Sequence, residues 1–448
     1  MTARIPKENS KIMSRLHDLL SKSVQIKPDE VRAFGWSFIY FFSLLCGYNM
    51  LKPIREAFGI TGGIENLQWL FTGTFIAMLA VVPLFGWISS KYTRRKFVPY
   101  AYYFFIGNLL IFFTLLQLDI NQVYVARAFF IWISVFNLFV VSVFWSFMAD
   151  IYNDEQARRL FPVIATGGTS GAIVGPLLTT TLTTTIGATN LLLLSAGFLA
   201  LAALCIRQLG QWQEEFNRPS VVDKKSDANK AMGGGIFDGI KLVLRSPYLI
   251  AIGLFIVLLA TLATFLYFQQ AEIIRDNFAS REERISVFAA IELIVNSLTL
   301  VLQLFITGRL LTRVGVGWTL ALVPIMLMFG FLALGLYPSL AVIIIVQVVR
   351  RVGNYAIMRP AREVLYVVLR KEEKYKAKNF IDTVIYRGGD AVSAWVYAGL
   401  QAIGLSLAAI AFVAIPLTGL WALLALYLGK QHQSLALTSA ETNHEAEK

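Results

Sequence analysis

The polar stretch RPSVVDKKSDANKAMGGG (Arg218–Gly235) divides this chain of 448 residues into two apolar halves. It lies in the longest polar segment, about residues 208–246, whose composition is typical of a linker. On both sides of it, apolar runs recur with the length of a bilayer-spanning helix, about 20 residues. Hydrophobic residues make up 56% of the chain and charged residues 15%, unlike soluble globular proteins. We therefore expect an all-α integral membrane protein.

The apolar runs predict twelve transmembrane helices, six on each side of the linker. Their expected bounds are 34–58, 67–90, 97–117, 124–149, 161–186, 189–207, 247–271, 285–308, 317–335, 339–369, 379–402 and 405–428. Six spans, a cytoplasmic linker and six more spans resemble the layout of the major facilitator fold. The predicted parts are an N-terminal segment (1–33), a first six-helix bundle (34–207), the linker (208–246), a second bundle (247–428) and a tail (429–448).

The distribution of lysine and arginine predicts the orientation of these spans. The segments after spans two and ten are rich in basic residues, at Lys91–Lys96 and Arg370–Lys378. In contrast, the loops at 59–66 and 117–122 contain no Lys or Arg. Since cytoplasmic loops carry the excess of positive charge, both termini are expected in the cytoplasm, with the protein in a bacterial inner membrane.

Composition excludes several classes of function. The net charge is +12, yet no basic helix stands apart from the spans, so a nucleic acid polymer is not an expected partner. Cys46 and Cys205 lie in apolar runs, and the histidines, His17, His432 and His444, lie in polar segments near the termini. No nucleophile or metal-ligand set of an enzyme is apparent. We expect a carrier, monomeric and without a cofactor or a metal, and not an enzyme.

Span ten carries the densest group of charges. At 100° per residue, five of its side chains fall within about 80° of one another: Arg351, Tyr355, Arg359, Arg362 and Tyr366. Pro360 is expected to interrupt the helix there. Charges inside a membrane segment often mark an aqueous pathway, and the planar guanidinium suits phosphate oxygens. This face therefore predicts a cavity that binds anions through Arg351, Tyr355, Arg359 and Arg362.

The alternative is that acidic residues on neighbouring helices neutralise these arginines. The residues predicted to balance charge or carry protons are Glu56, Glu292, Glu363, Asp382 and Asp390. Near span ten, arginines outnumber the acids Glu363, Asp382 and Asp390, which favours a cationic cavity. These arginines are Arg350, Arg351, Arg359, Arg362 and Arg387. Arg350 points away from the shared face, and we expect it to be structural.

Span one ends in a second charged group. Tyr48, Lys52 and Glu56 are four residues apart and share one helix face, with Arg55 beside them. Pro53 is expected to break the helix, and a broken helix flanked by charge is common at transporter binding sites. Tyr48, Lys52 and Arg55 are therefore predicted to bind substrate. The alternative is an anchor whose basic side chains snorkel to the membrane surface.

Two further patterns lie inside spans. Span eight carries a polar stripe that lines the cavity or bonds another helix: Glu292, Asn296, Thr299 and Gln303. Span five carries Gly167, Gly171 and Gly175, followed by Pro176. Small residues at this spacing let helices approach closely. The pattern also resembles the superfamily's glycine-proline motif, which is often linked to exchangers.

The charged segments resemble the ATP/ADP translocase-like nucleotide transporters of plastids and intracellular bacteria. Arg351 to Tyr355 begins the part of the chain that is similar to that family's signature. RPAREVLY (Arg359–Tyr366) is similar to its Pro-x-Lys-Glu-x-x-Tyr segment, and KAKNFID (Lys376–Asp382) to its Lys-x-x-x-Asp segment. LKPIRE (Leu51–Glu56) is similar to its first-helix basic motif. The resemblance implies nucleoside phosphates as substrates, with these matched positions: Lys52, Arg55, Arg351, Arg362, Glu363 and Asp382. Arg362 stands where the family has lysine.

We therefore expect a secondary active transporter that moves an anionic, phosphorylated, nucleotide-like solute across the inner membrane by alternating access. One alternative is a proton-coupled transporter or exporter of another organic anion derived from a peptide, a siderophore or a lipid. Another is a membrane enzyme or a lipid scramblase.

Overall fold

The computed structural model describes the chain except for residues 1–25, 92–93, 216–235, 370 and 447–448. For the helical residues 85–91, 94–96, 154, 215, 236–239, 371–375 and 438–446 it describes the backbone alone. Most of the predicted N-terminal segment and the linker stretch Arg218–Gly235 therefore lie outside the described residues. The side chains of the two basic segments that predicted the orientation are also largely outside them.

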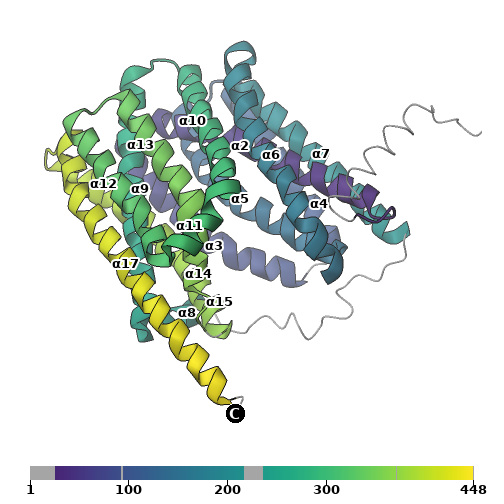
Figure 1. The fold of residues 1–448 in the computed structure, drawn as a ribbon. Coiled ribbons are helices and arrows are strands. Elements are labelled where there is room, and N and C mark those ends of the chain that lie inside the picture. Colours follow the sequence, from purple (N-terminus) through teal and green to yellow (C-terminus); the bar gives the residue numbers. More distant parts are fainter. Residues whose placement is uncertain (1–25, 92–93, 216–235, 370, 447–448) are drawn as a thin grey trace, which may run out of the picture. The chain divides into compact units, whose positions relative to one another are not determined.

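Every regular element within the described ranges is a helix (Figure 1). The first half comprises α2 (Val31–Thr61), a 3₁₀ turn η1 (Ile64–Asn66), α3 (Leu67–Lys91), α4 (Arg94–Gln117), α5 (Gln122–Ile151), α6 (Asp154–Ile186) and α7 (Ala188–Glu215). The second half begins with α8 (Ile236–Arg245), α9 (Pro247–Asn277), α10 (Arg281–Leu302), η3 (Gln303–Thr307), α11 (Gly308–Val314) and α12 (Val316–Leu336). It continues with α13 (Leu340–Val352), η4 (Gly353–Met358), α14 (Arg359–Leu365), α15 (Lys371–Phe380), η5 (Ile381–Ile385), α16 (Tyr386–Ala402) and α17 (Leu407–Ala446).

Among the described residues, eleven helices are long and apolar enough to cross a membrane, and each corresponds to a predicted span. The all-α membrane architecture is thus confirmed. The remaining predicted span, 379–402, is not among these eleven helices. It is helical, but it consists of the end of α15, the π-helical η5 and α16, and α16 has 17 residues that include Arg387 and Asp390.

The chain forms two compact units, and three of the five boundaries between them run within helices, in α2, α3 and α5. The first comprises Met1–Lys52, Pro83–Leu118 and Phe136–Asn229. The second comprises Pro53–Val82, Asp119–Val135 and Lys230–Lys448. Consequently the end of α2 that carries Arg55 and Glu56 groups with the helices of the C-terminal half.

The predicted glycine motif is a helix-packing site in the first unit. A Cβ atom added at Gly175 would lie 2.5 Å from the carbonyl oxygen of Cys46, and one at Gly171 would meet the carbonyl oxygen of Phe42 even more closely. Side chains therefore do not fit, and the backbones of α6 and α2 approach directly. The packing interpretation is confirmed, whereas the link to exchange remains a prediction.

A buried carboxylate fixes the beginning of α2 against α6. Glu30 accepts hydrogen bonds from Arg159 at 3.0 Å and from the amide of Gln156 at 2.8 Å, and its other oxygen accepts the Lys27 backbone N–H. Burial alone would raise the pKa of Glu30, but these hydrogen bonds and the Arg159 charge lower it below its ordinary value of 4.5.

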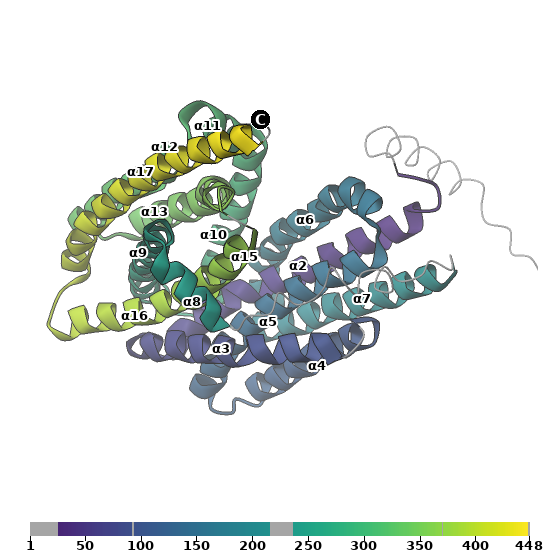
Figure 2. The ribbon, with the colours of Figure 1, turned by 90° about the horizontal axis from the view of Figure 1, so that it is seen from below.

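In the second unit α12 lies along α17, as both views show (Figures 1 and 2). Gly317 of α12 and Gly429 of α17 face each other, and a Cβ atom at either position would meet the backbone of the other glycine. This close crossing belongs to the same class of packing as the one between α6 and α2.

We predict that Gly171→Ala lowers the melting temperature of the purified protein. The added methyl group overpacks the crossing of α6 and α2, which typically costs about 1–3 kcal/mol. The matched control is Gly197→Ala, since a Cβ atom at Gly197 of α7 meets no atom within 4 Å. Equal melting temperatures for the two variants would contradict the packing role of the motif.

A second prediction concerns pH. Because the pKa of Glu30 is lower in the folded state than in the unfolded state, its contribution to stability is present above the unfolded value and is lost as pH falls through the folded value. Glu30→Gln should therefore lower the melting temperature at pH 7. The difference in melting temperature between this variant and wild type should become smaller at acidic pH. A difference that is constant from pH 7 to pH 3.5 would contradict this account.

Candidate functional site

The helix that carries the predicted arginine face is interrupted by a π-helix. Residues Gly353–Met358 form η4, between α13, which ends just after Arg351, and α14, which begins at Arg359. A π-helix has wider turns than an α-helix, so a uniform 100° per residue does not hold across it. The predicted common face of span ten is therefore wrong. Arg351 and Arg362 are largely buried, whereas Arg359 is exposed.

The π-helix adjoins Pro360, which does not end the helix. Pro360 occupies an early position of α14, and the chain stays helical on both sides of it. The same holds at Pro53, which lies inside the continuous helix α2, so the predicted break in span one is also wrong. Prolines are tolerated in membrane helices because neighbouring groups satisfy the backbone atoms that they leave unpaired.

Arg351 forms the most buried ion pair of the candidate site. Its guanidinium lies 2.5 Å from the carboxylate of Glu292 on α10, and the Glu292 side chain is only 1% exposed. The Glu56 carboxylate also acts on Arg351 electrostatically. The polar stripe of span eight thus bonds a neighbouring helix, as one of its two interpretations predicted.

Arg362 and the basic residues after it pair with predicted acids. The Arg362 guanidinium lies 3.2 Å from the Asp382 carboxylate of η5. Lys378 of α15 lies 2.5 Å from the Glu363 carboxylate, and its ammonium group lies 5.9 Å from the centre of the Tyr366 ring. The segments that resemble the nucleotide transporters therefore meet in space, although they are separate in the sequence.

The charged end of α2 contributes to the same unit. Arg55 lies 2.8 Å from Glu56 and stacks over the ring of Phe130 at 4.0 Å. The Tyr267 hydroxyl of α9 lies against the Glu56 carboxylate. The carboxylate and the aromatic face fix the direction of the guanidinium, whose planar fork can bind two oxygens of a carboxylate or a phosphate.

The remaining predicted residues are more dispersed. Asp390 of α16 lies 3.5 Å from Arg387, and the charges of Arg55 and Arg350 also act on it. Tyr48 packs its ring against Phe136 within the first unit. Lys52 is half-buried on α2, and Tyr355 lies within η4, where it acts electrostatically on Arg351.

Several contributors were not identified from the sequence. The expectation that Arg350 is structural fits its hydrogen bond, because its Nε donates to Gln347 at 3.0 Å, and Gln347 in turn donates to Gln270. A glutamine inside the apolar run LAVIIIVQVV was the available signal. Phe130 and Tyr267 gave no signal of their own, because aromatic residues are common throughout the spans. His432, which we expected in a polar segment, lies on the apolar helix α17 with a buried ring nitrogen.

One end of the second unit joins segments from both halves of the sequence. The rings of Trp69 of α3 and Trp395 of α16 meet edge to face, with centroids 4.7 Å apart. The indole N–H of Trp395 donates to the hydroxyl of Thr72 at 3.0 Å. Nearby, Arg281 of α10 donates to the side chain of Gln122 at 3.4 Å. The N-terminal ends of α3 and α5 therefore contact helices of the C-terminal half.

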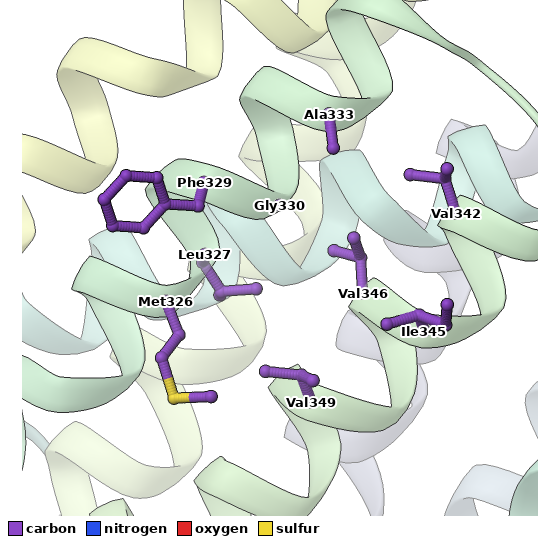
Figure 3. Close-up of a pocket in the computed structure, with 9 residues that line it drawn as sticks. All are labelled: Met326, Leu327, Phe329, Gly330, Ala333, Val342, Ile345, Val346 and Val349. Carbon is purple, nitrogen blue, oxygen red and sulfur yellow. The ribbon is translucent and has the colours of Figure 1, made fainter.

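A separate groove between α12 and α13 is entirely apolar (Figure 3). Its volume is about 430 Å³, and it is lined by Met326, Leu327, Phe329, Gly330, Ala333, Val342, Ile345, Val346 and Val349. None of these side chains can neutralise an anion, so the groove is not part of the candidate site.

The Arg351–Glu292 pair gives a stability prediction. Removing one partner of a buried pair leaves the other charge uncompensated and costs about 3–5 kcal/mol. We expect Glu292→Gln and Arg351→Met each to lower the melting temperature strongly, and the double variant to lose less than the sum of the two. Strict additivity would show that the two side chains do not depend on each other.

The comparisons with known proteins agree with this architecture. The sequence model of the Major Facilitator Superfamily matches residues 33–362. The chain is 22% identical over 453 aligned residues to ADP,ATP carrier protein 1 of Chlamydia muridarum (strain MoPn / Nigg), covering 85% of this chain and 84% of the relative. It is 24% identical to ADP,ATP carrier protein 1 of Chlamydia trachomatis serovar D, covering 61% of this chain and 58% of that protein.

Solved transporter structures share the fold at low sequence identity. A bacterial homologue of the iron transporter ferroportin in an inward-facing state has a TM-score of 0.64 at 11% identity, covering 89% of this chain and 99% of the other. The nucleoside transporter NupG has a TM-score of 0.61 at 15% identity, covering 90% and 98%. With the family match extending from α2 into α14, this chain belongs to the major facilitator superfamily, and it is a membrane transporter and not an enzyme.

Proposed function

We propose that this secondary transporter moves an anionic, phosphorylated, nucleotide-like solute. The observation that carries the proposal is a set of guanidinium groups, each largely buried and each held by a carboxylate: Arg55 with Glu56, Arg351 with Glu292, and Arg362 with Asp382. A multiply charged anion cannot leave water for a membrane interior unless cationic hydrogen-bond donors replace its hydration.

In this proposal the carboxylates bind the guanidinium groups when no substrate is present. A phosphate oxygen offers the guanidinium the same acceptor geometry as a carboxylate does, in a bidentate arrangement. Substrate would therefore compete with Glu292 and Asp382 for Arg351 and Arg362. The released carboxylates would then take up protons or pair with other cations, which gives the acids of the site their role in charge balance.

The aromatic residues of the site fit the rest of such a solute. Phe130 stacks on Arg55, and Tyr267 lies against Glu56. Aromatic rings next to cationic groups suit a planar base attached to phosphates. The two chlamydial relatives bear the name ADP,ATP carrier protein, and this supports a nucleotide among the possible phosphorylated solutes.

The wider arrangement follows from the superfamily. We propose twelve spans, with residues 379–402 completing the set, in two bundles (34–207 and 247–428) that rock around the central site. Both termini would face the cytoplasm of a bacterium, and the protein would act as a monomer in the inner membrane. The paired contacts of Trp69 with Trp395 and of Arg281 with Gln122 would then close the outer end of the pathway.

The test uses purified protein in liposomes loaded with unlabelled nucleotide. We expect uptake of labelled ATP or ADP by wild type, with a KM increased at least tenfold in Arg351→Ala and Arg362→Ala. Arg313→Ala is the matched control, because Arg313 is exposed on α11. If the two site variants transport nucleotides and other phosphorylated solutes as well as wild type does, the cationic-site assignment is wrong.

The same vesicles distinguish exchange from proton coupling. Uptake that requires internal nucleotide supports exchange. Uptake into empty vesicles, driven by an imposed pH gradient alone, would contradict exchange and favour a proton-coupled carrier.

A further inference from the structure

Two π-helical segments lie side by side in the second unit. One is η3, which follows α10, and the other is η4, which follows α13. Wide turns of this kind are rare, and those that occur are frequently at functional sites. They leave backbone groups without their ordinary helical partners. The carbonyl groups of η4 that lose their ordinary helical donors can be identified from its hydrogen bonds.

Two consecutive carbonyl groups of η4 lose their helical donors. The N–H of Arg359 bonds to the carbonyl of Asn354 and is therefore not given to Tyr355. The next residue, Pro360, has no N–H, so neither Tyr355 nor Ala356 can receive a hydrogen bond from it. In an apolar environment an unpaired carbonyl is costly, and a partner from outside the helix is required.

Side chains of η3 supply these partners. The amide of Gln303 donates to the carbonyl of Tyr355 at 3.2 Å, and the hydroxyl of Thr307 lies 2.7 Å from the carbonyl of Ala356. Thr307 is buried, and its hydroxyl also lies 3.1 Å from the carbonyl of Leu302 in its own helix. A hydroxyl has a single hydrogen, so the shorter contact identifies Ala356 as the main acceptor.

The wide turn that these bonds stabilise sets the directions of two arginines. In a regular α-helix, Arg351 and Arg362 would lie about 20° apart around the axis, since they are eleven residues apart. One additional residue in the turn rotates Arg362 away from Arg351 by about 100°. Arg351 thereby reaches Glu292 on α10, and Arg362 reaches Asp382 on η5.

We propose that Thr307 and Gln303 are positioning residues for the anion site. By bonding the two carbonyls next to Pro360, they hold the wide turn that points Arg362 toward Asp382 while Arg351 stays with Glu292. Neither residue touches the substrate in this assignment. For its relevance to transport the inference rests on the proposed function, but the geometry that it predicts can be measured without any substrate.

The first test measures the coupling between Arg362 and Asp382 from melting temperatures. The variants are Arg362→Met, Asp382→Asn and their combination, each made with Thr307 and again with Thr307→Val. Valine keeps the shape of threonine and removes the hydroxyl. We expect the two positions to be coupled in the presence of Thr307, to lose that coupling with Thr307→Val, and to regain it with Thr307→Ser.

The matched control is Thr312→Val. The Thr312 hydroxyl bonds only to carbonyls of its own turn, at Gly308 and Arg309, among the described residues. Its loss should leave the coupling unchanged. The proposal would be overturned if the coupling between Arg362 and Asp382 persisted in Thr307→Val. It would also be overturned if Thr307→Val and Thr312→Val reduced that coupling equally.

The second test is transport. Losing one hydrogen bond to a buried carbonyl corresponds to about a tenfold change in an equilibrium. We expect Thr307→Val to raise the KM for nucleotide about tenfold with little change in the maximal rate, and to add nothing in the Arg362→Ala background. If the coupling behaves as predicted but wild type transports no nucleotide, only the proposed substrate is wrong. If nucleotide is transported and Thr307→Val acts additively with Arg362→Ala, the positioning role is wrong.

Discussion

Burying charge in a membrane is the constraint on which the rest of this structure depends. A guanidinium inside a bilayer costs several kcal/mol unless it is paired or hydrated. The structure offsets that cost with an ion pair for each of three arginines. Arg55 pairs with Glu56 on α2, Arg351 with Glu292 of α10, and Arg362 with Asp382 of η5. Even Arg350, whose Nε bonds to Gln347, is held by a polar chain that continues to Gln270. Two of these pairs, Arg351–Glu292 and Arg362–Asp382, connect different helices, and so they contribute to the fold and to the site together.

The part of the fold that follows from hydropathy could be predicted. A run of about 20 apolar residues has few alternatives to a membrane helix, because the bilayer leaves no water to satisfy its backbone. The spans of the first half and most of the second followed from this rule. Residues 379–402 differ because a π-helix and the charges of Arg387 and Asp390 interrupt their apolar character. Pro53 misled the interpretation, since it predicted a break where α2 continues, whereas Pro360 adjoins the π-helix η4 without ending the helix.

The charged residues of the candidate site could be identified from the sequence, but the pairs that they form could not. Their residue types alone identified the arginines and the acids, because charged side chains are rare in membrane helices and usually have a function there. Which acid meets which arginine depends on helix register, and η4 changed that register between Arg351 and Arg359. Pro360 was the visible signal for a perturbed helix, but the partners of the freed carbonyls, Gln303 and Thr307, lie about fifty residues earlier in the chain. Contacts of that separation are set by packing, which local periodicity does not encode.

The boundaries between the two compact units have a mechanical consequence. Three of the five boundaries fall inside helices: between Lys52 and Pro53 in α2, between Val82 and Pro83 in α3, and between Val135 and Phe136 in α5. Any movement of one unit against the other must therefore bend these helices, because no loop is available there to take up the strain. Proline removes a backbone hydrogen bond and is the most frequent site of helix bending. Pro53 and Pro83 are therefore the points at which α2 and α3 bend most readily, and Lys52 and Arg55 lie on opposite sides of the first of them.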